Sequence, residues 1–359
     1  MKITVIGAYG YTGVLICAEL EKRNISFAVA GRNNSLLVAL KENFSLLTHT
    51  ICADINTANG IAEVLLGADL LINCAGPYNE ESAKFITAVA EQGKIYLDLC
   101  GELDFVKNSA AKNNLLAEAS GATLIHACAF ESLPADLIIN LLMEQTATIT
   151  DLRFFYSFTH SRPSPGTKLT MKLARFRQAL KISKGNWQVT DYAKDKLAVK
   201  WAQHPQLNMA VPYPLPEIAF SEWVCKPQES ASYLLLSKEE ATFINPLSES
   251  GPTKEEVIAT HKKRKAPGPQ QTERQLQEFK LIVCANYEND ETKCYSLSGN
   301  DMYLCTAQAI ALTVEEIITA KKIPTGVIRP SALFVGKEKE CLKQLGLELN
   351  LTSEFNFNE

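Results

Sequence analysis

The residues best placed to bind a ligand form a glycine-rich loop near the N-terminus. A short apolar run leads into Gly7-Ala8-Tyr9-Gly10-Tyr11-Thr12-Gly13, and an amphipathic run follows. A strand, a glycine turn and a helix in this order suit a dinucleotide pyrophosphate, because backbone N–H groups and the helix N-terminus face the phosphates. Gly7 then permits the tight turn, Gly10 the approach of backbone to phosphate, and Gly13 close packing of the helix. The alternative is a glycine turn in another kind of α/β protein.

The end of the second apolar run favours a phosphorylated dinucleotide. It reads Gly31-Arg32-Asn33, where an NAD enzyme usually has an acidic residue for the ribose 2′-hydroxyl. Arg32 can instead pair with a 2′-phosphate through its forked guanidinium, with Asn33 assisting. The alternative is a solvent-exposed loop arginine. The sequence therefore predicts NADP as cofactor, with NADPH preferred over NADH.

Further cofactor contacts are expected after the third and fourth strands. Asp54 can meet the adenine, although an Asx turn or a helix cap explains it equally well. Small residues after the fourth strand let the backbone run beside the ribose, and Pro77 stiffens that turn. The predicted cofactor-binding residues are Gly7, Tyr9, Gly10, Tyr11, Thr12, Gly13, Arg32, Asn33, Asp54, Ile55, Cys74, Ala75, Gly76 and Pro77.

Three residues that follow strands could carry acid–base chemistry. Tyr78 is predicted to lie near the nicotinamide and is the favoured proton donor, although a packed tyrosine is equally compatible. Glu102 follows the fifth strand and Glu131 the sixth, and carboxylates gathered at this edge can perturb protonation. Alternatively, Glu102 caps the following helix, and His126 inside the sixth strand is a satisfied core histidine. No metal site is predicted.

The elements that must position these residues alternate between strand and helix from residue 1 to about 145. Near-continuous apolar runs separated by helical patterns are typical of a parallel sheet covered by helices on both faces. The expected strands are Ile3–Ile6, Phe27–Ala30, Thr50–Ala53, Leu70–Cys74, Ile95–Asp98 and Thr123–Ala127. We therefore predict an α/β protein with an N-terminal Rossmann domain, a doubly wound parallel sheet, at residues 1–145.

The pattern changes after residue 145. Aromatic and β-branched runs predict a second, α+β domain with a largely antiparallel sheet at residues 146–299, used for substrate binding or dimerisation. Residues 300–359 are predicted to pack back on the first domain. Residues 211–216 and 252–271 contain prolines and are predicted to be loops. The catalytic cleft is expected between the Rossmann strand ends and the second domain.

Bulk properties exclude several classes of protein. The net charge of −4 leaves no excess of basic residues for nucleic acid, and no apolar run is long and uninterrupted enough for an integral membrane segment. Ten cysteines without CxxC pairs suggest reduced thiols and neither a zinc site nor a disulfide framework. The chain begins directly with a core strand, so a cytoplasmic protein is expected.

These motifs resemble the saccharopine-dehydrogenase-like oxidoreductases, in particular the trans-acting enoyl reductases. The similar blocks are residues 7–13, 30–32, 73–78, 96–102 and 129–136, with 165–167, 306–307 and 326–333 in the second half. The resemblance implies a Rossmann domain, a nicotinamide cofactor and reductive chemistry on a small-molecule substrate. It does not fix the substrate, because relatives act on different ones.

Three hypotheses follow. The first is an NADP-dependent oxidoreductase that reduces a conjugated C=C bond of an apolar or lipid-like small molecule. The second is a saccharopine-like imine reductase or amino-acid dehydrogenase. The third is a non-catalytic NADP-binding regulatory protein, and a homodimer stays open for each.

Overall fold

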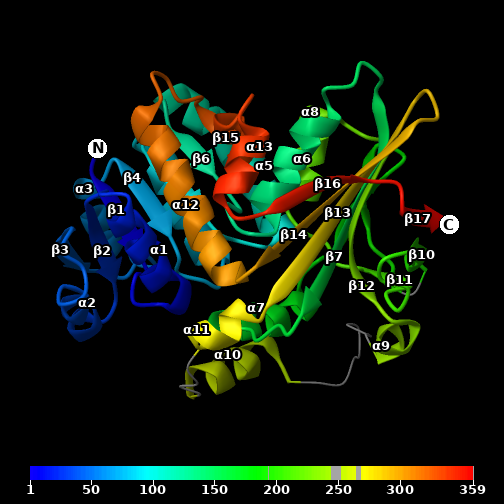
Figure 1. Ribbon diagram of the computed structural model, residues 1–359. Coiled ribbons are helices and arrows are strands. Elements are labelled where there is room, and N and C mark those ends of the chain that lie inside the picture. The colour runs from blue at the N-terminus through cyan, green and yellow to red at the C-terminus, as the bar shows by residue number, and fades with distance from the viewer. Residues whose placement is uncertain (193, 244–251, 264–267, 359) are drawn as a thin grey trace. The chain divides into compact units, whose positions relative to one another are not determined.

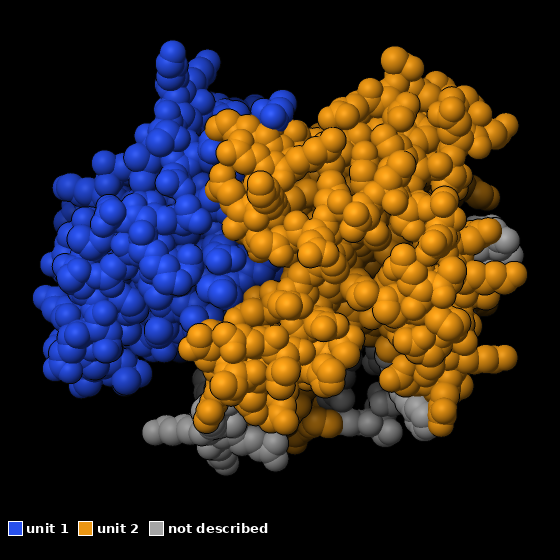
Figure 2. Space-filling view, in the orientation of Figure 1, with its two compact units in different colours: residues 1–133, 303–336 blue, residues 134–302, 337–359 orange. Residues whose placement is uncertain are grey.

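The computed structural model describes residues 1–192, 194–243, 252–263 and 268–358 (Figure 1). The chain divides into two compact units, which are coloured separately in Figure 2. Unit 1 comprises residues 1–133 and 303–336, and unit 2 comprises residues 134–302 and 337–359. Each unit contains its own β-sheet.

Unit 1 is built on a parallel sheet whose described strands run in the order β15-β6-β5-β4-β1-β2-β3. The order reverses between β1 and β4, and this switch point is where doubly wound sheets bind ligands, beyond the strands' carboxyl ends. Most of these strands are buried, as expected for a sheet covered on both faces. The strands are β1 (Ile3–Ile6), β2 (Phe27–Gly31), β3 (Leu47–Cys52), β4 (Leu70–Asn73), β5 (Ile95–Asp98), β6 (Thr123–Ile125) and β15 (Gly326–Ile328).

Helices cover this sheet. The helices α1 and α12 lie side by side (Figure 1), joined by an edge-to-face contact of Tyr11 with Tyr303 and an ion pair of Arg23 with Glu315. The helices wholly or mostly in unit 1 are α1 (Tyr11–Lys22), α2 (Asn34–Leu40), α3 (Ala58–Leu66), α4 (Glu80–Glu91), α5 (Leu103–Ser120), α12 (Met302–Thr319) and the 3₁₀ turn η2 (Pro330–Leu333). The predicted doubly wound parallel sheet is therefore confirmed.

Unit 2 is built on a mixed sheet. Among its described strands, the order is β16-β14-β13-β7-β12-β11-β10-β17; in addition, β8 pairs with β12, and β9 pairs with β8. In the part of this sheet that the structure describes, the pairing of β7 with β12 is parallel and the other pairings are antiparallel, so the predicted largely antiparallel sheet is confirmed. The strands are β7 (Ile149–Thr159), β8 (Leu180–Ser183), β9 (Asn186–Val189), β10 (Leu197–Trp201), β11 (Met209–Pro212), β12 (Glu229–Leu236), β13 (Glu278–Tyr287), β14 (Thr292–Asn300), β16 (Glu348–Thr352) and β17 (Phe355–Asn358).

The sheet of unit 2 curls. The strands β16 and β17 stand at opposite ends of its order, yet only Ser353 and Glu354 separate them in the chain. Two residues span only about 10 Å, so the two ends of the sheet must approach each other. A core that includes Phe155, Trp201 and Tyr233 lies on one face. The helices of this unit are α6 (Ser132–Leu142), α7 (Pro165–Leu173), η1 (Ala174–Phe176), α8 (Glu217–Val224), α9 (Lys238–Phe243), α10 (Lys254–Lys263), α11 (Gln271–Gln275) and α13 (Glu338–Gln344).

Three local predictions need correction. Residues 337–359 do not pack with the first sheet, because β16 pairs with β14 and β17 with β10 in the second. The predicted loop at 252–271 contains α10, whose start has reciprocal bonds between Thr253 and Glu256. The predicted loop at 211–216 begins with the last two residues of β11. Residues 264–267 of the first loop lie outside the described residues.

The expectation of reduced cysteines is also wrong at one place. Cys284 and Cys294 form a disulfide, because the antiparallel register of β13 and β14 sets them directly opposite each other. Among the described residues, no helix combines the length and the apolarity that a membrane crossing needs. The cellular compartment stays a prediction.

Candidate functional site

The loop between β1 and α1 has the shape of a phosphate cradle. Gly7 has φ +74°, a left-handed conformation, and a Cβ there would come within 3.1 Å of Ala75. A Cβ on Gly13 would lie 2.5 Å from the carbonyl oxygen of Gly7, so α1 packs against the loop more closely than a side chain allows. These two glycines therefore have the geometric roles that the sequence predicted.

Gly10 leaves room in front of the helix. Its N–H donates to the Gly7 carbonyl at 2.8 Å, and it is the residue that precedes α1. Apart from its neighbours in the chain, the only atom of the described residues that a Cβ on Gly10 would meet within 4 Å is the Gly7 oxygen, at 3.0 Å. The space that a side chain would fill is the space that a pyrophosphate needs. The loop therefore fits a dinucleotide, and the predicted contacts of Tyr11 and Thr12 in the first turn stay predictions.

The end of β2 is arranged around Tyr9. The Tyr9 ring covers Gly31, where a Cβ would lie 2.6 Å from the ring, and the Tyr9 hydroxyl accepts the N–H of Arg32 at 3.1 Å. The side chains of Arg32 and Asn33 are exposed. Asn33 caps α2 by accepting the N–H of Leu36. Arg32 is therefore anchored by its backbone while its guanidinium is exposed to solvent, where a 2′-phosphate could meet it.

Asp54 does form the Asx turn that was its alternative explanation. Its Oδ1 accepts the N–H of Asn56 at 3.1 Å, and its carbonyl accepts the N–H of Thr57, the cap of α3. Ile55 is buried, with 7% of its surface exposed. An adenine contact of either residue stays a prediction.

The turn after β4 runs beside the glycine loop. The N–H of Cys74 donates to the carbonyl of Ile6, and Ala75 lies against Gly7. Gly76 is exposed, and the Gly76-Pro77 peptide bond is cis. The predicted segment 74–77 thus lies at the same edge of the sheet as the cradle, although none of its contacts to a cofactor is tested.

Tyr78 directs its hydroxyl inward. The hydroxyl donates to the carbonyl of Asn73 at 2.8 Å, and 5% of the residue is exposed. Burial, and next the charge of Asp98, raise the pKa of Tyr78 well above its ordinary value. The hydrogen bond fixes the turn after β4, and this geometry favours a structural role.

Glu102 and Glu131 follow neighbouring strands and influence each other. Glu102 precedes α5, is 5% exposed, and accepts the N–H of Gly101 at 3.0 Å. Glu131 directly precedes α6; the residue is half-buried and its Oε2 atom is buried. Burial raises the pKa of Glu131 to about 7, its own backbone N–H lowers it, and the charge of Glu102 raises it further. Such a carboxyl can hold and release a proton near neutral pH.

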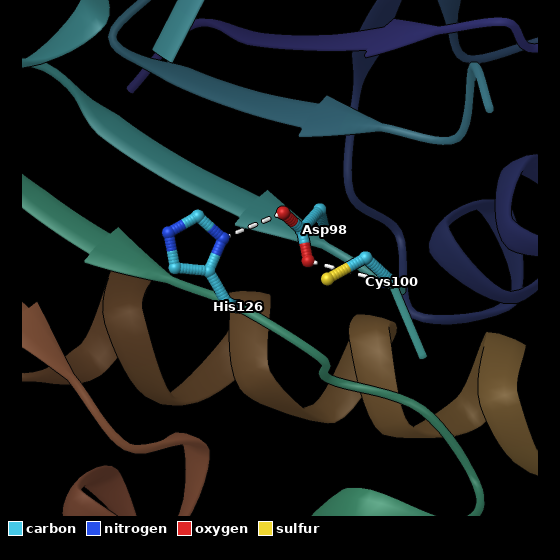
Figure 3. A group of neighbouring side chains, drawn as sticks. All are labelled: Asp98, Cys100 and His126. Carbon is cyan, nitrogen blue, oxygen red and sulfur yellow. Dashed lines mark hydrogen bonds and ion pairs between the residues drawn. The ribbon is translucent and has the colours of Figure 1, made fainter. Parts of the chain in front are cut away.

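Asp98, Cys100 and His126 form a buried group at the ends of β5 and β6 (Figure 3). Asp98 Oδ2 lies 2.7 Å from His126 Nδ1, and Asp98 Oδ1 accepts the N–H of Cys100 at 3.2 Å. His126 Nε2 lies 2.9 Å from the hydroxyl of Ser109. Both ring nitrogens and both carboxylate oxygens therefore already have partners, and burial raises the pKa of the Cys100 thiol well above its ordinary value. We assign no metal to this group.

Sequence reasoning treated these residues separately and missed their connection. His126 is a satisfied core histidine, as the alternative interpretation held. Its pairing with Asp98 follows from the adjacency of β5 and β6, which the alternation of strands and helices already suggested. The contribution of α12 was also missed: the Thr306 hydroxyl accepts the N–H of Phe130, next to Glu131.

A family model matches the part of the chain that holds the glycine loop. Residues 3–125 match the family model described as saccharopine dehydrogenase NADP binding domain. A trans-acting enoyl reductase of Mycobacterium ulcerans is 31% identical over 151 residues, which cover 41% of this chain and 36% of that protein. A saccharopine dehydrogenase-like oxidoreductase of Mus musculus is 29% identical over 171 residues, covering 43% and 40% respectively. The matches thus span less than half of these relatives.

One solved structure is similar over nearly the whole chain. It is an apo saccharopine dehydrogenase (L-Glu forming) from Saccharomyces cerevisiae, with a TM-score of 0.64 over 98% of this chain and 100% of that one. The sequence identity is 12%, so this likeness is one of fold. The family match and the cradle geometry together indicate a nicotinamide dinucleotide as the cofactor.

Proposed function

Because residues 3–125 belong to the saccharopine dehydrogenase NADP-binding domain family, we propose that this chain is an NADPH-dependent oxidoreductase that reduces a conjugated C=C bond of an apolar small molecule. The observation that carries the proposal is the placement of a phosphate cradle and a pair of acidic side chains after parallel strands of one sheet. The named activity of the Mycobacterium ulcerans relative supports the choice of an enoyl substrate.

The preference for NADPH rests on the end of β2. Arg32 stands where a ribose-binding acid would otherwise be, and its exposed guanidinium can form charge-assisted bonds to a 2′-phosphate. The Tyr9 hydroxyl holds the backbone of Arg32, which limits the directions that its side chain can take. Gly7, Gly10 and Gly13 would hold the pyrophosphate.

The acid–base step falls to Glu131. When bound, the reduced nicotinamide supplies a hydride to the electron-poor β-carbon of the alkene. Reduction also requires a proton at the α-carbon, and Glu131 can donate it because burial raises its pKa to about 7, which leaves a substantial share of the carboxyl protonated at neutral pH. The charge of Glu102 adds to the effect of burial on this pKa, and water returns the proton after each turnover. Tyr78 holds the turn after β4 and donates no proton in this proposal.

The imine-reductase hypothesis uses the same residues. A hydride and a proton also reduce a C=N bond, and the fold is that of a saccharopine dehydrogenase. A substrate panel separates the two, because an enoyl reductase acts on α,β-unsaturated thioesters or ketones and an imine reductase on an oxo acid with an amine. A regulatory protein would bind NADPH but would not oxidise it with either class of substrate.

The decisive experiment compares Glu131→Gln with a matched control. NADPH oxidation with the substrate panel should fall about 100-fold or more in Glu131→Gln, as expected when a general acid is lost. NADPH affinity should not change. Glu63→Gln removes an exposed carboxylate of α3 and should keep the full rate. A full rate in Glu131→Gln would contradict the assignment of the acid, and binding without turnover of any panel member would favour the regulatory hypothesis.

A further inference from the structure

The buried group around Asp98 extends into a chain of hydrogen bonds inside unit 1. His126 bridges the carboxylate of Asp98 and the hydroxyl of Ser109, and the amide of Asn113 donates to that hydroxyl at 3.2 Å. Asp98, His126 and Asn113 are 0% exposed and Ser109 is 4% exposed. These side chains are too deeply buried to touch a substrate, so an Asp–His–Ser series of this kind does not act as a nucleophile and its base.

Asp98 joins two loops that are distant in sequence. Its Oδ1 accepts the N–H of Cys100 in the loop after β5 and the N–H of Ala127 at 2.8 Å in the loop after β6. Its backbone carbonyl accepts the N–H of Cys128, also at 2.8 Å. One residue thus fixes both chain segments where they leave the sheet.

The second of these loops has an unfavourable backbone conformation. Ala127 has φ +56°, which is uncommon for a residue with a Cβ and costs on the order of 1 kcal/mol or more. The surrounding structure must supply that energy, and the bond from Ala127 N–H to the Asp98 carboxylate does so directly. The loop then reaches Glu131 four residues later, just as the first loop reaches Glu102 four residues after Asp98.

We propose that Asp98 is a positioning residue, oriented by His126, that holds in place the two loops leading to Glu102 and Glu131. The inference rests on the proposed function, because that function gives the two carboxyls their acid–base role. The positioning itself is a property of the free protein. Burial would raise the pKa of Asp98, but His126 and the two backbone N–H groups lower it below its ordinary value. The Asp98 carboxylate therefore stays ionised at neutral pH.

The test is a carboxyl titration that needs neither cofactor nor substrate. Protein labelled with ¹³C at the glutamate side-chain carboxyls is titrated by NMR, and Glu131→Gln assigns the Glu131 signal. Burial keeps Cys100, Tyr78 and Tyr96 protonated through neutral pH, and the charge of Glu102 raises the pKa of Glu131. Asp136 of α6 is buried and common to all variants.

Two substitutions of His126 separate positioning from a general loss of stability. An asparagine amide can replace Nδ1 and keep the bond to Asp98, whereas a glutamine amide replaces Nε2 and keeps only the bond to Ser109. His126→Gln should lower the pKa of Glu131 by about one unit or more, toward the ordinary value, because the loops loosen and solvent reaches the carboxyl. His126→Asn should leave it near 7. Both substitutions remove the imidazole and keep the carboxylate of Asp98, so a difference between them reports which hydrogen bond the amide keeps.

The proposal is overturned if Glu131 titrates as in the unmodified protein in His126→Gln, or if both variants shift it equally. If His126→Gln does not fold, Ser109→Ala decides instead, because it removes the other partner of His126 and leaves Asp98 intact. That variant should shift the pKa in the same direction by a smaller amount, and an unchanged pKa would refute the proposal. If the pKa of Glu131 shifts in His126→Gln but the unmodified protein oxidises NADPH with no member of the substrate panel, the proposed function is refuted and the positioning role remains.

Discussion

The glycine loop, residues 7–13, and the acidic edge, which comprises Asp98, Glu102, His126 and Glu131, both lie at the carboxyl ends of strands in the sheet of unit 1. The two regions depend on different physical properties. In the glycine loop, the proposed phosphate binding depends on the absence of side chains, which allows positive φ, close backbone approach and open space. In the acidic edge, the proposed acid–base chemistry depends on side chains that are present: Asp98 and His126 are buried and bonded to each other, and the carboxyls of Glu102 and Glu131 interact by charge. The first can be broken by adding atoms, and the second by removing single hydrogen bonds.

The largest effect is expected from adding atoms to the loop. Gly10→Val should weaken NADPH binding by about 100-fold or more while the protein stays folded, because the side chain would occupy the phosphate space. Fluorescence titration measures binding and circular dichroism measures folding. Gly67→Val is the matched control, since a Cβ on Gly67 meets nothing within 4 Å. Unchanged binding in Gly10→Val would mean that the loop holds no pyrophosphate.

A smaller effect is expected at the rim of the same site. Arg32→Ala should weaken NADPH binding roughly 10- to 100-fold and leave NADH binding unchanged, because a charge-assisted bond is worth about 1.5–3 kcal/mol. Calorimetric titration with both cofactors measures the ratio. Lys41→Ala removes another exposed cation, at the end of α2, and should change neither affinity. Equal affinity of the unmodified protein for both cofactors would contradict the predicted preference.

In the acidic edge, the effect of Glu131 should appear in the free energy of unfolding rather than in cofactor affinity. The pKa of Glu131 rises from an ordinary 4.5 to about 7 on folding, so between these values the folded state binds more protons than the unfolded state. Stability should therefore fall as pH rises through this window. Glu131→Gln removes the penalty and should stabilise the protein at pH 8 by on the order of 2 kcal/mol, with little effect below pH 4.5. Urea unfolding at both pH values checks this, with Glu63→Gln as control. Equal stability of Glu131→Gln and the unmodified protein at pH 8 would refute the raised pKa.

The glycine loop could be predicted from sequence because its chemistry is local. Gly7, Gly10 and Gly13 are close in the chain, and each has a role that depends on its own backbone or its nearest neighbours. The same holds for the strands of unit 1, whose apolar runs mark them directly. The helix α10 was missed although its signal, Thr253 three residues before Glu256, is also local; the prolines nearby outweighed it.

The acidic edge could be predicted only in its parts. Glu102 and Glu131 were identified as residues that follow strands and Asp98 as the end of one, but the bond between Asp98 and His126 joins residues 28 apart in the chain. The sequence alone also gives no direction for the Tyr78 hydroxyl. For the same reason the disulfide of Cys284 with Cys294 and the placement of β16 and β17 depend on strand register, which no single-chain pattern specifies.

The smallest effect is expected at Tyr78, where the sequence and the structure favour different roles. Tyr78→Phe removes a buried hydrogen bond to the Asn73 carbonyl and should cost about 1 kcal/mol of stability, with NADPH affinity unchanged. If Glu131 is the acid, turnover and its pH profile should also stay close to those of the unmodified protein. Thermal unfolding and the NADPH oxidation assay, run on the same samples, measure both. A 100-fold loss of turnover with an intact Tm would return the proton donor to Tyr78 and would mean that the turn after β4 opens during catalysis to release its hydroxyl.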